Sequence, residues 1–141
     1  MGMLNEHPYT RVEFDWLACD LDGYIAYLSS AGAGPVPEAA VENSDFLEGV
    51  LDLIRELPRS GAAILMGETS KPPDWKDAAE RGFFSYDWSY AHHRYELVAR
   101  PSSPVRLDKL PQPKLREAAA HVRLHAHFSE VDHISPDVEL T

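Results

Sequence analysis

The sequence predicts an α+β fold, in which a mostly antiparallel sheet of about five strands has two to three helices packed on one face. Short runs of alternating apolar and polar residues, joined by turn residues, are typical of antiparallel strands. Other stretches have apolar residues at helical spacing. The chain has 141 residues, the size of one domain. We therefore expect a single domain over residues 1–141, with frayed tails at 1–10 and 131–141.

An antiparallel hairpin is expected near the N-terminus. Its two strands are predicted at residues 12–21 and 24–29. In the first strand apolar residues alternate with polar ones, and this alternation places Trp16 on a buried face. Asp22-Gly23 predicts a two-residue turn between the strands, because both central positions of that turn need a positive φ, which Asp and Gly tolerate.

A loop and a helix are expected next. Residues 31–37 contain two glycines and two prolines, which predicts a loop, because proline lacks the amide donor of a strand ladder. Residues 45–57 have apolar side chains at helical spacing, so we expect one helix there. Its exposed side carries an acidic stripe with intervals of four residues. The stripe consists of Glu48, Asp52 and Glu56.

After residue 61 we expect two helices and two strands, in addition to a second hairpin. The apolar run at 62–66 predicts a buried strand. A short helix is expected from Asp74 to Gly82, because glycine suits the position after a last helical turn. Pro113 favours the first turn of a helix that continues to about residue 120. Alternation over 122–128 predicts a last strand.

A second hairpin carries the most distinctive surface of the sequence. Its strands are predicted at 84–88 and 95–99, and two of the three aromatic residues Tyr86, Trp88 and Tyr95 are expected in the core. Its connection gathers aromatic, imidazole and carboxylate side chains, and aromatic residues are favoured anchors of protein interfaces. The binding candidates at this tip are Asp87, Tyr90, His92 and His93.

Composition narrows the class of partner. Asp and Glu number 23 against 13 Lys and Arg, and the formal net charge is −10. Such a field repels phosphate backbones and attracts cationic partners, so we expect neither nucleic acid nor a membrane as a partner. The single cysteine, Cys19, permits no internal disulfide, and its apolar surroundings predict a core residue. No stretch is long and apolar enough to span a bilayer. We therefore expect a cytoplasmic protein.

One motif suggests chemistry. Asp20-Leu21-Asp22-Gly23 is similar to the nucleophile motif of haloacid-dehalogenase-type phosphatases, in which one Asp attacks phosphorus and the second handles the leaving-group proton. That chemistry needs Thr or Val after the Gly and a crossover to a helix, whereas Tyr24 continues into a second strand. We therefore interpret the motif as a hairpin turn.

Several histidines are closely spaced. His121, His125 and His127 fall within one short segment. His125 and His127 share a face of the predicted strand and could chelate a divalent ion, with Asp132 or His133 as a third ligand. Their spacing matches no established zinc pattern, and exposure to solvent explains them without a ligand. We therefore expect no metal, no cofactor and no catalytic residue.

Four blocks of the sequence carry a resemblance to a known family. They are Phe14–Asp20 with Asp22-Gly23, Ser29–Pro37, Gly82–Trp88 and Tyr95–Pro101. These blocks resemble a group of small bacterial proteins that look like immunity proteins of polymorphic toxin systems, which bind the toxin of a sibling cell and block it. The resemblance implies a function in binding and assigns no functional residue.

The leading hypothesis is an immunity protein, or antitoxin, that neutralises a cognate bacterial toxin by direct contact. A net negative charge suits a basic toxin such as a nuclease, because opposite fields accelerate association. Two alternatives stay open. One is a small metal-dependent or phosphoryl-transfer hydrolase that uses Asp20, Asp22 and the histidines. The other is a non-catalytic regulatory or scaffold module that binds another basic protein.

Overall fold

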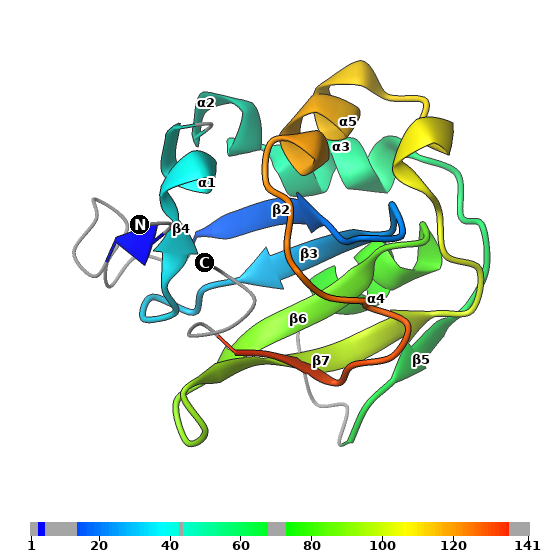
Figure 1. Cartoon of the computed structure of the whole chain (residues 1–141). Coiled ribbons are helices and arrows are strands. Elements are labelled where there is room, and N and C mark those ends of the chain that lie inside the picture. Colours follow the sequence, from blue (N-terminus) through cyan, green and yellow to red (C-terminus); the bar gives the residue numbers. More distant parts are fainter. Residues whose placement is uncertain (1–2, 5–13, 43, 68–72, 136–141) are drawn as a thin grey trace.

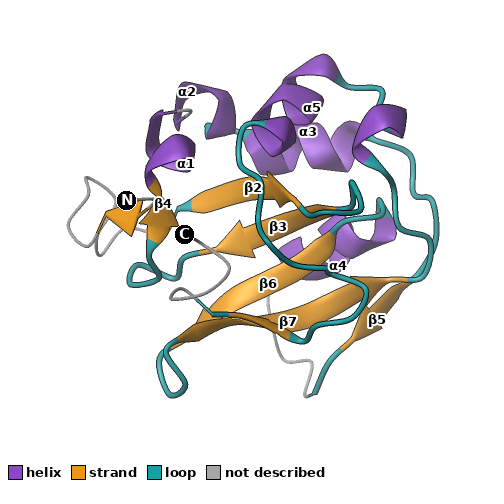
Figure 2. Ribbon diagram, viewed as in Figure 1, coloured by secondary structure: helices purple, strands orange, loops and turns teal. Residues whose placement is uncertain are grey.

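The computed structural model describes residues 3–4, 14–42, 44–67 and 73–135 (Figure 1, Figure 2). They form an α+β fold around a curled mixed sheet of about five strands, which confirms the predicted fold class. The strands are β1 (Met3–Leu4), β2 (Asp15–Cys19), β3 (Ile25–Ser29), β4 (Val36–Pro37), β5 (Ala63–Leu65), β6 (Phe84–Ser89), β7 (Arg94–Pro101) and β8 (His133–Ile134). The helices are α1 (Glu38–Glu42), α2 (Ser44–Leu47), α3 (Val50–Glu56), α4 (Asp74–Glu80), the 3-10 helix η1 (Leu107–Lys109) and α5 (Pro113–Ala120).

The main sheet has the strand order β2–β3–β6–β7–β5, and β8 also pairs with β7. β3 and β6 run parallel, whereas the other pairings between the described strands are antiparallel. The chain order permits the parallel pair, because β4, α1 to α4 and β5 lie between these two strands and provide the long crossover that parallel neighbours need. β1 and β4 form a separate two-stranded sheet.

The two faces of the main sheet are covered by different parts of the chain. Trp16 and Tyr86 lie on the same face and are fully buried, which confirms the core position predicted for Trp16. The segment after α5 crosses this face (Figure 1), and the rings of Phe128 and Tyr86 pack with centroids 5.6 Å apart. On the opposite face, the Ser85 hydroxyl donates to the carbonyl oxygen of Trp75 in α4 at 2.9 Å.

β2 and β3 confirm the first hairpin, but its turn is longer than predicted. The Asp20 N–H donates to the Tyr24 carbonyl oxygen at 3.0 Å, and within this loop only Gly23 has a positive φ, of 84°. The two-residue turn is wrong because the Asp20 side chain organises a larger loop. Its Oδ1 accepts the N–H groups of Asp22 and Tyr24 at 2.9 and 2.8 Å. Residues 12–13 of the predicted strand lie outside the described residues.

The single helix predicted over 45–57 is two helices in the structure. α2 ends at Leu47 and α3 begins at Val50, because Gly49 between them has a left-handed φ of 73° that interrupts a helix. The predicted apolar face still reaches the core, since Leu47, Val50 and Ile54 are buried. The break therefore redirects the chain without exposing the apolar face.

β5 is an edge strand and not the buried strand predicted for 62–66. It pairs with β7, and Ile64, Leu65 and Met66 are 48%, 39% and 39% exposed. A short apolar run has the same pattern at an edge as in the middle of a sheet, so periodicity does not separate the two. β5 has three residues, and a very short edge strand is one of the ways in which proteins limit pairing with other chains.

Residues 122–128 do not form the predicted last strand, and bends at residues 125–126 and a turn at Phe128 interrupt the segment. Arg123 makes an isolated parallel bridge with Cys19, and the backbone lacks a continuous ladder. The alternation nevertheless predicts burial correctly. The buried positions are Val122, Leu124, Ala126 and Phe128. Alternation thus reports which side chains face the core and not whether the backbone has a neighbouring strand.

The second hairpin and the helices α4 and α5 match the predicted elements closely. The aromatic residues Tyr86, Trp88 and Tyr95 of the hairpin are all buried, one more than expected. Residues 133–134, expected in a frayed tail at 131–141, instead form β8 against β7. Residues 136–141 and most of the tail expected at 1–10 lie outside the described residues.

Candidate binding surface

The tip of the β6–β7 hairpin presents exposed side chains on a buried aromatic base. Tyr90 is 62% exposed, and the His92 side chain is 61% exposed. Beneath them the rings of Trp88 and Tyr95 pack edge to face with centroids 5.2 Å apart, and both residues are buried. The tip residues therefore project from a packed base, as the sequence predicted for Tyr90 and His92.

A second loop lies against this tip. The Tyr90 hydroxyl donates a hydrogen bond to the carbonyl oxygen of Ala31 in the loop after β3. Ala31 and His93 each have a φ of 53°, a left-handed conformation that is uncommon for residues other than glycine. Such backbone outliers cluster at functional sites. We call residues 31–34 and 90–93 together the two-loop surface.

Close packing fixes the two loops relative to each other. The Tyr95 hydroxyl donates to the Pro35 carbonyl oxygen at 2.9 Å and accepts from Trp16 Nε1 at 3.3 Å. A Cβ atom at Gly34 would lie 2.6 Å from the Tyr95 hydroxyl oxygen, so glycine is required where this loop crosses the hairpin. Burial raises the pKa of Tyr95, which keeps its hydroxyl a donor.

Charged groups of both signs lie beside the tip. One Glu96 carboxylate oxygen lies 2.8 Å from His92 Nδ1 and 3.0 Å from Arg94 Nε. Partial burial acts to raise the pKa of Glu96, but the hydrogen bonds from Arg94 and His92 together outweigh it and hold the pKa below its ordinary value. Asp87 is half-buried and lies opposite Glu96 in the register of β6 and β7. This side of the tip is therefore suited to polar contacts.

The predicted acidic stripe is interrupted in the structure. Glu48 lies in the turn between α2 and α3, whereas Asp52 and Glu56 lie one turn apart on α3. All three residues are exposed. Figure 1 shows α3 and the β6–β7 tip on opposite sides of the molecule, so the two predicted binding candidates do not form one surface.

The Asp-Leu-Asp-Gly motif holds the first hairpin loop. Asp20 is 1% exposed. Besides the two N–H groups of its own loop, its carboxylate accepts the N–H of Phe128 through Oδ2 at 2.8 Å. Both oxygens of Asp20 therefore bind backbone N–H groups. Cys19, just before the motif, is buried as predicted, and burial raises the pKa of its thiol.

The C-terminal histidines lie beside different carboxylates. His127 Nδ1 is 2.7 Å from Asp22 Oδ2, and His133 Nδ1 is 2.8 Å from Asp132 Oδ1. His125 is exposed. Among the described residues, no group of three or more His, Cys, Asp or Glu side chains is placed to hold a metal ion.

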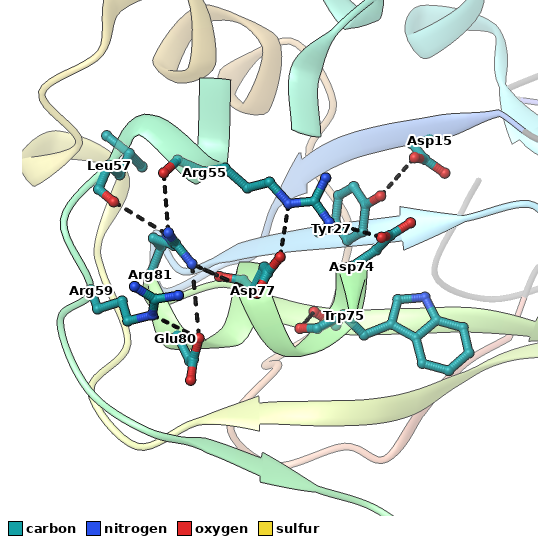
Figure 3. Close-up of polar contacts among 11 residues, drawn as sticks. Asp15, Tyr27, Arg55, Leu57, Arg59, Asp74, Trp75, Asp77, Glu80 and Arg81 are labelled. Carbon is teal, nitrogen blue, oxygen red and sulfur yellow. Dashed lines mark hydrogen bonds and ion pairs between the residues drawn. The ribbon is translucent and has the colours of Figure 1, made fainter. Parts of the chain in front are cut away.

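A polar network that the sequence did not indicate joins α3 to α4 (Figure 3). The buried Arg81 donates to the carbonyl oxygens of Arg55, Leu57 and Asp77 at 3.0, 3.2 and 3.2 Å. Arg55 pairs with Asp77 and Asp74 at 2.7 and 3.0 Å. Because Arg81 binds carbonyls at the C-terminal end of α3, which lack helical partners, the network fixes α3 against α4.

Sequence reasoning identified the tip residues but missed the loop beside them. Residues 31–34 belong to residues 31–37, which were expected to be no more than a connecting loop. A signal was present, because a loop with two closely spaced glycines, Gly32 and Gly34, can adopt backbone conformations and close contacts that other residues do not allow. The contact partner of this loop is far away in the chain, so the signal alone did not reveal the surface.

Within the described part of the chain, no helix combines the length and the apolar character needed to cross a bilayer. A scan against protein-family models finds no match, and no curated protein or solved structure matches the chain. The two-loop surface is therefore assigned as the candidate site on its geometry and chemistry alone.

Proposed function

We propose that this chain is an immunity protein that binds a cognate bacterial toxin in the cytoplasm through the two-loop surface and blocks it by direct contact. One observation carries the proposal. The exposed ring of Tyr90 projects from a buried base and is tied to a second loop through Ala31. Aromatic anchors that lose little freedom on binding are typical of the residues that dominate interface energies.

The charge of the chain supports a basic partner. Its formal net charge of −10 produces a field that attracts cationic proteins and accelerates their association. A nuclease toxin needs a basic surface to bind phosphate backbones, so it belongs to the class that this field favours. The resemblance to immunity proteins of polymorphic toxin systems supports the same class of partner.

An immunity protein is expected to have its toxin encoded by a neighbouring gene, and the test uses the product of that gene. The double variant Tyr90→Ala, His92→Ala is compared with wild type by calorimetric titration and by survival of cells that express the toxin. Truncation of interface hot spots costs at least about 2 kcal/mol, so we expect Kd to rise by about 30-fold or more. Tyr90→Phe keeps the ring and removes only the bond to Ala31, and a smaller rise is expected for it.

Two further variants serve as controls. Reversing the charges of Asp52 and Glu56 on α3 is expected to slow association and leave dissociation nearly unchanged, since charges outside an interface act mainly on the association rate. Glu117→Ala on the exposed side of α5 removes a single charge and should change both rates much less than the α3 reversal does. If the folded tip variant binds with wild-type affinity and protects cells, the surface is wrong. If the wild-type chain does not bind the toxin, the function is wrong.

A further inference from the structure

The segment between α5 and β8 crosses the sheet face opposite α4 (Figure 1). We call its first part, residues 122–128, the strap. Its backbone meets β2 and the loop that follows at separate points: the Cys19 N–H donates to the Val122 carbonyl oxygen at 2.8 Å, and the Leu21 N–H to that of Ala126 at 3.1 Å. Because no continuous ladder of backbone hydrogen bonds holds the strap, individual side-chain contacts contribute more to keeping it in place.

Two side-chain contacts join the end of the strap to the loop of the first hairpin. Asp20 Oδ2 accepts the N–H of Phe128 at 2.8 Å in a buried contact. Beside it, His127 Nδ1 lies 2.7 Å from Asp22 Oδ2, with the two side chains 43% and 38% exposed. Both carboxylates come from the motif that resembles a phosphatase nucleophile. The structure uses both to hold the strap.

We propose that His127 and Asp22 form a pH-sensitive clasp, which holds the strap to the loop while the imidazole is protonated and loosens it when the proton leaves. The charged groups around the imidazole are Asp22 and Asp20 from the loop and Glu130 from the segment after the strap. The positive charge of Arg106 acts against these carboxylates. Its guanidinium lies nearby and donates to the Asp22 carbonyl oxygen at 2.5 Å. Three carboxylates against one guanidinium favour the protonated imidazole.

The sign of the effect follows from the direction of the shift. The hydrogen bond to Asp22, and then the charge of Asp22, raise the pKa of His127 above its ordinary value of 6.5. A raised pKa means that the clasp contributes fully below pH 6.5 and loses its contribution as the pH rises through the raised pKa.

Hydrogen exchange of the whole chain tests the clasp, measured from about pH 5.5 to about pH 8.5 and corrected for intrinsic rates. The amides that report on it are those of Leu21 and Phe128, because both donate across the contact. Their protection should fall about two- to five-fold over this range, as expected for one solvent-exposed ion pair. His127→Gln should remove this dependence, whereas His125→Gln, an exposed neighbour, should retain it.

A charge-free partner and a direct titration complete the test. Asp22→Asn keeps the size of the side chain and should give the same pH-independent protection as His127→Gln. In a proton NMR titration, His127 should titrate at a higher pH in wild type than in Asp22→Asn, because the substitution removes the carboxylate that raises its pKa. A His127 that titrates at the same pH in wild type and in Asp22→Asn, or a His127→Gln variant with the wild-type exchange profile, would overturn the clasp.

Discussion

Replacing Asp20 with Asn tests whether this carboxylate has a structural role. In the structure its Oδ1 accepts the N–H groups of Asp22 and Tyr24, and its Oδ2 accepts that of Phe128. Asparagine has the same size but replaces one oxygen with an NH₂ donor. If its remaining oxygen serves Asp22 and Tyr24, the new NH₂ group faces the N–H of Phe128, and two donors then meet in a buried site.

The magnitude follows from the bonds that are lost. A hydrogen bond to a charged group contributes about 1.5–3 kcal/mol, and the two bonds that remain lose the assistance of the charge. We therefore expect Asp20→Asn to lower the free energy of unfolding by about 2–4 kcal/mol. Urea denaturation followed by tryptophan fluorescence measures this loss. Asp108→Asn, on the exposed side of η1, is the matched control and should stay within about 0.5 kcal/mol of wild type.

A loss below about 1 kcal/mol for Asp20→Asn would refute the structural role. The alternative hydrolase predicts the opposite pattern. Catalytic side chains are often held at the expense of stability, so replacing a nucleophile tends to preserve or raise stability while activity disappears. Measuring the stability of the variant together with the phosphatase activity of both proteins therefore separates the two interpretations of the motif.

Two further substitutions test the core and the helix network. Trp16→Ala removes a fully buried aromatic side chain and should lower the free energy of unfolding by about 3–5 kcal/mol in urea denaturation; an unchanged midpoint would mean that the register of β2 is wrong. Arg81→Met deprives three backbone carbonyls of α3 and α4 of their donor and should cost about 2–4 kcal/mol. Arg59→Met, 63% exposed, is its control, and equal losses in the two variants would contradict the network.

The fold could be predicted where the local pattern decides the structure. In β7 the side chains alternate strictly between buried and half-buried positions, and periodicity found this strand. The break at Gly49 could not be predicted, because an isolated glycine inside a helical pattern is often tolerated. The edge position of β5 could not be predicted either. It depends on β7 pairing with β5 on one side and β6 on the other, which is decided by contacts far apart in the sequence.

The sequence predicted which residues lie at the tip, but not that a second loop packs against them. Aromatic and imidazole side chains between two strands identified the tip, and the structure exposes Tyr90 and His92 as expected. The bond from Tyr90 to Ala31 joins residues 59 positions apart, and no local pattern encodes such a contact. In the sequence, the glycine at position 34 came closest to indicating this contact, because Gly34 packs so closely on Tyr95 that a side chain does not fit.

Under the proposed function, the acidic residues of α3 and the two-loop surface act on different steps of binding. Asp52 and Glu56 are exposed, and no aromatic side chain accompanies them on α3, so they act through a long-range field that raises the association rate and weakens with salt. Tyr90 is already held by its bond to Ala31, so its ring loses little freedom when a partner covers it. Affinity differences among variants of one interface arise mainly from dissociation. The tip should therefore determine how long the toxin stays bound, and the charge how quickly it is found.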